Sequence, residues 1–126
     1  MLSPVQSLTY TIVLCDDIDR MKAFYQDLFS FEVDSETDES LALRAGTVLL
    51  GLRKRTRHYD GRSGGKEFPG VQLAFFVSPE EVEACHQILL SKGVEILDPP
   101  ADQPRGHRTC YFSDPEGNVL EVYAEI

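Results

Sequence analysis

A cluster of basic residues in the middle of the chain is the first feature with recognisable chemistry. Six of the twelve Lys and Arg residues lie within residues 53–67, with two acidic residues among them, so this segment has a net charge of +4. Guanidinium groups bind carboxylates and phosphates through paired hydrogen bonds. Two interpretations stay open: the segment is a flexible, solvated loop, or Arg53 or Arg57 contacts an anionic group on a ligand or a partner chain.

Two other segments have the composition of a binding loop but not its spacing. Residues 61–66 contain the glycines and the lysine of a phosphate loop, yet they lack the Gly-Lys-Ser/Thr ending and do not lead from a strand into a helix. Residues 34–39 hold four acidic side chains, which we interpret as a solvated hairpin rather than a calcium loop. No spacing suggests a Ser-His-Asp or Cys-His arrangement, so nucleophilic catalysis has little support.

The three cysteines, Cys15, Cys85 and Cys110, are odd in number and far apart. Each lies in a segment of apolar periodicity, and there is no CxxC pair of the kind found in zinc ribbons and thioredoxin-type sites. We therefore interpret them as buried free thiols in a reducing compartment. The first residues lack a basic region followed by an apolar stretch, so we expect no secretory signal and a cytoplasmic location.

Length and overall charge exclude several classes of protein. A chain of 126 residues fits one domain, or two small repeated halves with a common core, and can be stable without a disulfide or a structural metal. With 12 basic and 21 acidic residues the net charge is −9, which would repel the phosphates of a nucleic acid. No apolar run approaches the roughly 20 residues of a membrane span. We therefore expect neither nucleic acid nor membrane as a partner.

Hydrophobic periodicity predicts two successive groups of elements in the same order. In the first half, a strand over residues 8–14 precedes a helix that begins after Asp16. In the second half, a strand over residues 71–77 precedes a helix that starts with a capping box from Ser78 to Glu81. Three strands follow each helix: residues 31–36, 41–44 and 47–53 in the first half, and residues 94–97, 107–112 and 119–124 in the second.

Each predicted helix has one apolar stripe that we expect to be buried. Residues three and four apart lie on the same face of a helix, so apolar side chains at that spacing form a continuous surface. The stripe residues are Ile18, Met21, Phe24, Tyr25, Leu28 and Phe29 in the first helix, and Val82, Cys85, Ile88 and Leu89 in the second.

The two halves also align with each other. A shift of 62 residues places Tyr10 on Gln72, and a shift of 71 places residues 46–50 on residues 117–121, so that Leu50 falls on Glu121. Two βαβββ modules therefore fit the chain. We predict an α+β fold in a single domain spanning residues 1–126, with module one at about residues 6–53, a basic linker at 54–69 and module two at about 70–126.

Two motifs connect this pattern to a known family. Residues 17–25 (Asp-Ile-Asp-Arg-Met-Lys-Ala-Phe-Tyr) resemble the first-helix signature of the vicinal oxygen chelate superfamily, and residues 114–121 (Asp-Pro-Glu-Gly-Asn-Val-Leu-Glu) resemble its closing motif. This superfamily includes glyoxalase I, extradiol dioxygenases, fosfomycin-resistance transferases and bleomycin-resistance proteins. The resemblance implies a curved, incompletely closed eight-stranded mixed sheet around a cavity, with the helices outside, and a homodimer.

The resemblance also implies where a metal would bind. Members that use a divalent ion place four ligands on the first and last strands of the two modules, and the ion polarises two oxygens of the substrate. The matching positions here are Tyr10, Leu50, Gln72 and Glu121. Only Glu121 is an ordinary ligand for such an ion, and Leu50 cannot bind one. We therefore predict no metal and no cofactor, with a divalent ion as the less favoured alternative.

The histidines do not supply the missing ligands. His58 lies in the basic segment, and His86 lies on the second predicted helix, where we expect it to pack at the edge of the core. His107 begins a strand and points either into the cavity or to solvent. Tyr10, Gln72 and Glu121 can equally be polar groups on a partly filled sheet with no role in binding. The residues that we predict to bind a small-molecule ligand are Tyr10, Leu50, Gln72, His107, Glu121, Arg53 and Arg57.

Three functions stay open at this point. We favour a metal-free binding protein of this superfamily that holds a small, partly apolar organic molecule, such as a drug or an aromatic metabolite. The second is a lyase, isomerase or dioxygenase with an atypical site, in which Glu121 acts as general base or as one metal ligand, helped by Tyr10 or His107. The third is an interaction or regulatory module whose core binds no ligand.

Overall fold

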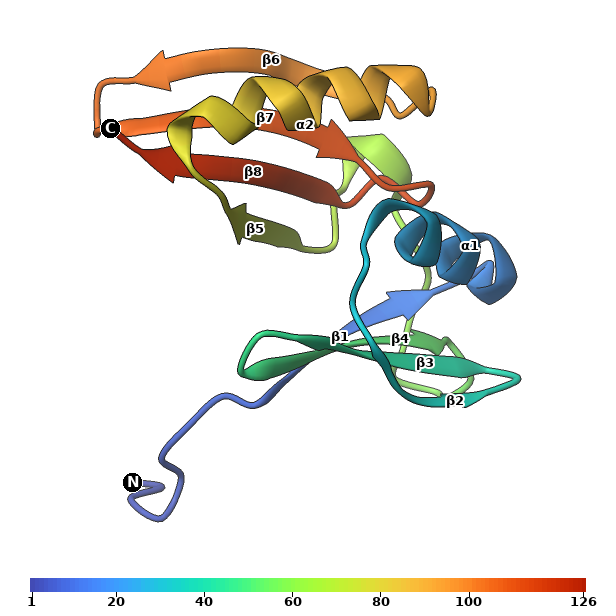
Figure 1. The fold of residues 1–126 in the computed structure, drawn as a ribbon. Helices are drawn as coiled ribbons and strands as arrows, with labels where there is room; N and C mark the ends of the chain where they lie inside the picture. Colours follow the sequence, from blue (N-terminus) through green and yellow to red (C-terminus); the bar gives the residue numbers. More distant parts are fainter. The chain divides into compact units, whose positions relative to one another are not determined.

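The computed structural model describes residues 1–126, which form two compact units, Met1–Arg62 and Ser63–Ile126. Each unit contains a βαβββ module, as predicted from the sequence (Figure 1). The first comprises β1 (Tyr10–Cys15), α1 (Ile18–Leu28), β2 (Val33–Thr37), β3 (Ser40–Ala45) and β4 (Val48–Lys54). The second comprises a short 3-10 helix, η1 (Gly65–Glu67), then β5 (Gln72–Phe76), α2 (Pro79–Ser91), β6 (Ile96–Gln103), β7 (His107–Ser113) and β8 (Val119–Glu125).

Both units have the same sheet topology. The strand order is β1-β4-β3-β2 in the first unit and β5-β8-β7-β6 in the second. β1 is parallel to β4 and β5 is parallel to β8, while all other neighbours are antiparallel. The parallel pairs arise because each helix carries the chain from one edge of its sheet to the opposite edge. The predicted α+β fold is confirmed, as two open, four-stranded mixed sheets. Neither helix is long and apolar enough to span a membrane.

Helix α1 packs on one face of the first sheet. It begins where the side chain of Asp17 accepts a hydrogen bond from the backbone N–H of Arg20, at 3.2 Å. The predicted stripe is buried at Ile18, Met21 and Tyr25. These side chains form the core of the unit with the following buried residues of the sheet: Val13, Cys15, Leu41, Leu43, Leu50 and Leu52.

A buried lysine ties α1 to the acidic hairpin. The Lys22 ammonium group donates to the backbone oxygen of Thr37 at 2.6 Å and lies 3.1 Å from a carboxylate oxygen of Glu36. All five residues of β2 are exposed. The solvated hairpin predicted for residues 34–39 is therefore confirmed, with one buried cation holding it against the helix.

Helix α2 begins with the capping box that the sequence predicts. The backbone N–H of Ser78 donates to the carboxylate of Glu81 at 3.0 Å. Val82 and Leu89 are buried, but Ile88 is half exposed. Because a helix turns about 100° per residue, Ile88 lies roughly a quarter turn or more away from the line joining Val82 and Leu89. The predicted stripe is therefore wrong at that position.

The closing motif folds as a turn built on Asp114. One carboxylate oxygen accepts hydrogen bonds from the backbone N–H groups of Glu116 (2.9 Å) and Asn118 (3.0 Å), and the other accepts from the side-chain amide of Asn118 (2.8 Å). Gly117 has φ +86°, in the left-handed region that favours glycine. A Cβ there would lie 2.5 Å from the carbonyl carbon of Gly65, because η1 packs on this turn. The hydrogen bonds of Asp114 thus stabilise the turn that leads into β8.

One strand is longer than the sequence predicts. The prediction ended it at residue 97, whereas β6 continues to Gln103 and includes Pro99 and Pro100. Proline lacks an N–H group, but β6 is an edge strand, so no neighbour on its outer side requires that donor. The register shifts between Asp98 and Ala101 accommodate the two prolines.

Candidate functional site

The sheet of the second unit packs against α2 on one face and carries a hollow on the other. Successive residues of a strand point to opposite faces. On β8, Leu120 and Val122 are buried in the core, while Glu121 and Tyr123 point into the hollow. The hollow has a volume of about 390 Å³. It is lined by Gln72, Ala74, Arg105, His107, Tyr111, Glu121 and Tyr123.

The floor of the hollow is formed by a carboxylate and an amide that contact each other. The side-chain amide of Gln72 donates to a carboxylate oxygen of Glu121 at 2.9 Å. Glu121 is only 8% exposed. The register of the parallel pair places Ala74 directly beside Glu121 and Gln72 one pleat away on the same face. The small side chain of Ala74 leaves the space above this pair open.

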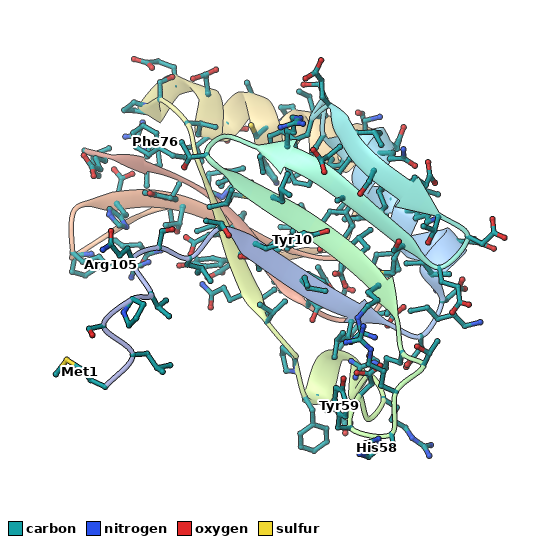
Figure 2. The ribbon with its side chains drawn as sticks, turned by 90° about the horizontal axis from the view of Figure 1, so that it is seen from below. Met1, Tyr10, His58, Tyr59, Phe76 and Arg105 are labelled. Atoms are coloured by element: carbon teal, nitrogen blue, oxygen red, sulfur yellow. The ribbon has the colours of Figure 1, made fainter.

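Aromatic rings and one arginine form the rest of the hollow. The rings of His107 and Tyr123 lie with centroids 5.0 Å apart, and Phe76 contacts Tyr123 edge-on at 5.4 Å. Arg105, in the hairpin between β6 and β7, donates to the hydroxyl of Tyr111 at 2.8 Å. Arg105 is exposed at the rim of the hollow and is labelled in Figure 2.

Three of the predicted ligand-binding residues therefore come together. Gln72, His107 and Glu121 all line the same hollow. The sequence left open whether His107 points into the cavity or to solvent. In the structure His107 lies on β7 and points into the hollow, as Tyr111 does. That these residues bind a ligand stays a prediction.

The two predicted residues in the first unit lie on opposite faces of its sheet. Tyr10 is 40% exposed and Leu50 is 3% exposed. The ring of Tyr10 lies across Gly51, so close that a Cβ on Gly51 would be 2.4 Å from the Tyr10 Cε1 atom. Leu50 instead packs in the core formed with α1.

The predicted alignment of Leu50 with Glu121 is wrong by one residue. Tyr10 pairs with Leu49 in the first sheet, and Gln72 pairs with Val119 in the second. Two residues after Leu49 on β4 comes Gly51, and two residues after Val119 on β8 comes Glu121. Gly51 therefore matches Glu121. The error arose because aligning the hairpin glycines preserves the turns, whereas hydrogen-bonding register decides which side chains share a face.

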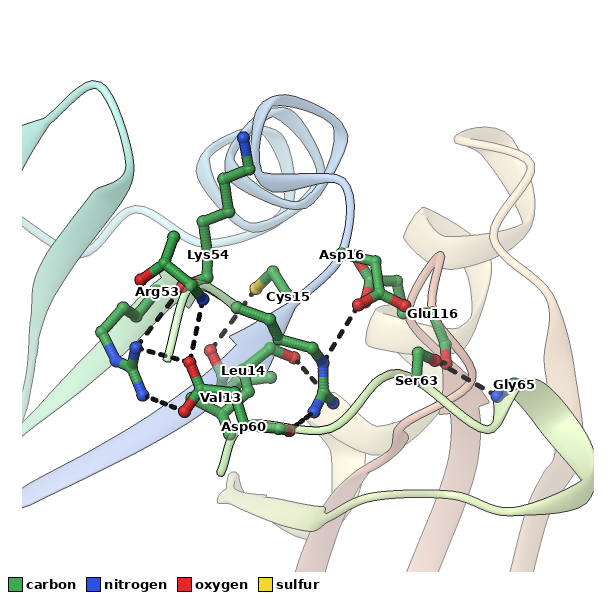
Figure 3. A network of polar contacts seen from close by, with 12 residues as sticks. Val13, Leu14, Cys15, Asp16, Arg53, Lys54, Asp60, Ser63, Gly65 and Glu116 are labelled. Atoms are coloured by element: carbon green, nitrogen blue, oxygen red, sulfur yellow. Dashed lines mark hydrogen bonds and ion pairs between the residues drawn. The ribbon is translucent and has the colours of Figure 1, made fainter. Parts of the chain in front are cut away.

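The basic linker is organised around one buried aspartate (Figure 3). The guanidinium of Arg53 donates to both carboxylate oxygens of Asp60, each at 2.9 Å. The same carboxylate accepts from the backbone N–H groups of Thr56 and Arg57, also at 2.9 Å. The hydrogen bonds from Arg53, then that from Arg57, hold the pKa of Asp60 far below its usual range. These hydrogen bonds hold this part of the linker around Asp60.

Arg55 and Arg57 of the linker have different partners. Arg55 pairs with Asp16 at 3.1 Å and also donates to the backbone oxygen of Asp60. Arg57 is exposed, and its guanidinium lies 3.3 Å from the hydroxyl of Tyr59 at the loop tip, where Figure 2 labels His58 and Tyr59. Asp60 of the same chain is therefore the anion that Arg53 binds. Binding of an external anion stays a prediction for Arg57.

The remaining histidine and the cysteines lie where the sequence indicates. His86 is half-buried on α2, with its Nδ1 atom 3.6 Å from Glu83, at the edge of the core as expected. None of the three cysteines forms a disulfide; Cys15 and Cys110 are buried, and Cys85 is half-buried. Burial raises the pKa of the Cys110 thiol to about 11, which disfavours the reactive thiolate.

The donor set does not fit a divalent metal of the family type. No group of three or more His, Cys, Asp and Glu side chains is arranged to hold an ion. Of the matched positions, only Glu121 offers a carboxylate, and that carboxylate accepts a hydrogen bond from Gln72. The position in the first unit that matches Glu121 is Gly51, which has no side chain. No metal-dependent step is derived for this site.

Sequence reasoning missed four residues of the hollow: Ala74, Arg105, Tyr111 and Tyr123. Ala74 is signalled by the period of two along a strand, counted from Gln72. Tyr123 and Tyr111 are signalled by the period of two along a strand, counted from Glu121 and from His107 respectively. Arg105 has no such signal, because it lies in the turn between two strands and reaches Tyr111 only through the length of its side chain.

Comparison with known proteins agrees with this geometry. The sequence model of the Glyoxalase/Bleomycin resistance protein/Dioxygenase superfamily matches residues 7–122, which include both modules. The chain belongs to this superfamily. The resemblance seen in the two motifs is therefore confirmed.

Individual relatives are distant but cover most of the chain. Metallothiol transferase FosB of Staphylococcus saprophyticus is 24% identical over 98% of this chain and 78% of its own length. Among solved structures, a glyoxalase/bleomycin resistance protein/dioxygenase from Nocardioides matches with a TM-score of 0.83 at 23% identity, over 97% of this chain and 85% of that one. The fosfomycin resistance protein FosX from Listeria monocytogenes matches with a TM-score of 0.73 at 20% identity, over 97% and 95%. These structural likenesses show the shared fold.

Proposed function

We propose that this protein binds a small, partly aromatic organic molecule in the hollow of its second unit, without a metal ion. The volume of about 390 Å³ lies in the range of roughly 300–1,000 Å³ that is usual for small-molecule sites. Its walls combine aromatic rings with a few polar groups, which is the composition that such sites need for affinity and orientation.

The observation that carries this proposal is the hydrogen bond between Gln72 and Glu121. In the metal-using members that the motifs resemble, the matching positions hold metal ligands. Here the neutral amide of Gln72 donates to the Glu121 carboxylate at 2.9 Å. In a metal site, both side chains would instead point their oxygens at the ion. A carboxylate held in this way offers a hydrogen-bond acceptor to an organic molecule.

A matched pair of leucine substitutions tests the location of binding. Both alanines are exposed, but Ala74 lines the hollow beside Glu121, whereas Ala84 lies outside it, on α2. In Ala74→Leu the larger side chain fills the hollow, and in Ala84→Leu it points to solvent. With p-cresol and a panel of small aromatic compounds as probes, we expect amide chemical-shift changes around Glu121 in the wild type and in Ala84→Leu, but not in Ala74→Leu. Equal changes in both variants would contradict the proposal.

The metal-free part of the proposal has its own test. Protein purified without chelators is analysed for Mg, Mn, Fe, Co, Ni, Cu and Zn, and thermal unfolding is recorded with and without each added ion. We expect far less than one ion per chain and no shift of Tm, because only one carboxylate is available. A near-stoichiometric ion that is lost in Glu121→Gln would overturn this part.

A second candidate is an enzyme in which Glu121 acts as a general base. The observation that favours it is the position of this carboxylate at the floor of a hollow beside aromatic rings, within reach of a bound molecule. Its test is turnover of any compound that the binding experiment identifies. Activity that is unchanged in Glu121→Gln would exclude that role.

The homodimer that the family resemblance implies stays a prediction. Sedimentation velocity at micromolar concentration measures the mass of the particle directly. A single species at the mass of one chain, 14.2 kDa, would contradict it.

A further inference from the structure

Half of the eight arginines of the protein pair with an aspartate, whereas one arginine at the hollow has a neutral partner. Arg44, Arg53, Arg55 and Arg108 each form an ion pair with an aspartate. The recorded partner of Arg105 is the hydroxyl of Tyr111, which carries no charge to neutralise the guanidinium. In a chain of net charge −9, Arg105 is thus a cation at the rim of the hollow whose side-chain partner is neutral, as is that of Arg57 outside the hollow.

The geometry of Arg105 also favours binding of an external anion. One of its terminal nitrogens is held by Tyr111 at 2.8 Å, which orients the planar guanidinium. A guanidinium has five N–H donors, so the others stay available for a carboxylate. Because part of the side chain is already ordered, an anion that binds here loses less conformational entropy to the protein.

The floor of the hollow has the opposite polarity. Glu121 is buried there, and one of its oxygens accepts from Gln72, while an ionised carboxylate can accept several hydrogen bonds. The floor therefore favours a hydroxyl or amine of the ligand over a second anion. The ring of Tyr123 contacts the rings of His107 and Phe76, lines the hollow and offers a surface for an aromatic ring.

We infer that the ligand class is an aromatic molecule with a carboxylate at one end, bound by Arg105, and a hydroxyl or amine at the other, bound by Glu121. This inference rests on the proposed function, and it adds the chemistry and the orientation of the ligand. The donor end lies deep in the hollow and the anionic end lies at the rim. Arg105 is thereby a specificity-determining residue.

Three related compounds separate the contributions of the two ends. 4-Hydroxyphenylacetate carries both groups, phenylacetate lacks the hydroxyl, and p-cresol lacks the carboxylate. Binding is measured by titration calorimetry near neutral pH. Because hydrogen bonds to charged groups are the stronger ones, we expect 4-hydroxyphenylacetate to bind about tenfold or more tightly than either analogue.

Variants of Arg105 and Glu121, the residues proposed to bind the two ends of the ligand, provide the matching test. Arg105→Gln should weaken 4-hydroxyphenylacetate by about tenfold and leave p-cresol nearly unchanged, because only the first has a carboxylate. Glu121→Gln should weaken p-cresol and 4-hydroxyphenylacetate while leaving phenylacetate nearly unchanged. The control is Arg62→Gln, which removes the same charge from an exposed residue outside the hollow and should alter none of the three affinities.

The possible results distinguish this inference from the proposed function. If the three compounds bind equally well and Arg105→Gln has no effect, the ligand class is wrong while aromatic binding stands. If none of the three binds but other compounds of the aromatic panel do, the ligand class is again wrong and the proposed function stands. If no aromatic compound perturbs the hollow, both fail. Affinity of 4-hydroxyphenylacetate that falls with added salt in the wild type and not in Arg105→Gln would support the ion pair.

Discussion

The phenol ring of Tyr10 lies directly over Gly51, and a Cβ on that glycine would come within 2.4 Å of the ring. Gly51 is the residue of the first unit that matches Glu121 of the second. One module thus has an aromatic ring over a bare backbone where the other has a carboxylate in a hollow. The pseudo-repeat that produced two similar sheets has therefore not produced two similar sites.

Gly51→Ala should destabilise the protein through this contact. The methyl group forces the ring of Tyr10 aside, and overpacking of this kind costs about 1–3 kcal/mol. Urea unfolding measures the loss in the free energy of unfolding. In the background Tyr10→Ala the same change should cost much less, because the ring is absent. Equal losses in the two backgrounds would show that the ring is not the cause.

Asp60→Asn should change how stability depends on pH. The hydrogen bonds from Arg53 lower the pKa of Asp60 in the folded state below the ordinary 3.8. A lowered folded pKa contributes stability that is complete above the unfolded-state pKa and is lost as pH falls through the folded one. The difference in unfolding free energy between wild type and Asp60→Asn should therefore be largest near neutral pH and shrink between about pH 5 and about pH 2.

The control for this pH series is Asp38→Asn, which changes an exposed residue of the acidic hairpin. Its stability should follow that of the wild type at every pH. A constant difference between wild type and Asp60→Asn across the whole range would show that the carboxylate has no lowered pKa.

Asp114→Ala should destabilise the second unit by removing the acceptor of the closing turn. Three hydrogen bonds from Glu116 and Asn118 are lost, and the expected cost is about 2–4 kcal/mol. Asp114→Asn retains one acceptor oxygen and should lose less. Thermal and urea unfolding give both values. If the two variants were equally stable, the backbone hydrogen bonds to Asp114 would not be what holds the turn.

Two adjacent leucines in α2 test which face of the helix is buried. Leu89 is 3% exposed and Leu90 is 50% exposed. Leu89→Ala leaves a cavity in the core and should cost about 2–5 kcal/mol. Leu90→Ala should cost less than about 1 kcal/mol, because its side chain is already largely hydrated. Similar losses for both would mean that another surface covers Leu90 in solution.

Much of the fold follows from local patterns. The start of α2 at Ser78 was predictable because capping depends on side chains within a few residues of each other, whereas the cap of α1 was predicted one residue too early, at Asp16 instead of Asp17. The strand over Pro99 and Pro100 was not, because proline is tolerated there only at the edge of a sheet, and edge position is a property of the whole sheet.

In the candidate site, too, some residues could be predicted from the sequence and others could not. Gln72 and Glu121 were predictable from the repeat and the motif, since strands with matching order bring equivalent positions to one face, whereas the sequence left the facing of His107 open. Leu50 was assigned to the wrong face because a one-residue error in register reverses the direction of a side chain. Arg53 looked like a free cation because Asp60 is seven residues away, a separation at which only the folded loop brings the two together.

The sequence by itself determined the two modules, the order of their elements and the family, because these depend on periodicity, capping and turn residues that act over short distances. Only the tertiary structure decided the rest: that Gly51 rather than Leu50 matches Glu121, that Gln72 contacts the carboxylate, and that Arg105 reaches the hollow. Each of these depends on strand register or on the reach of a side chain across a sheet. Such relationships are set by packing of the whole module, and no local pattern contains them.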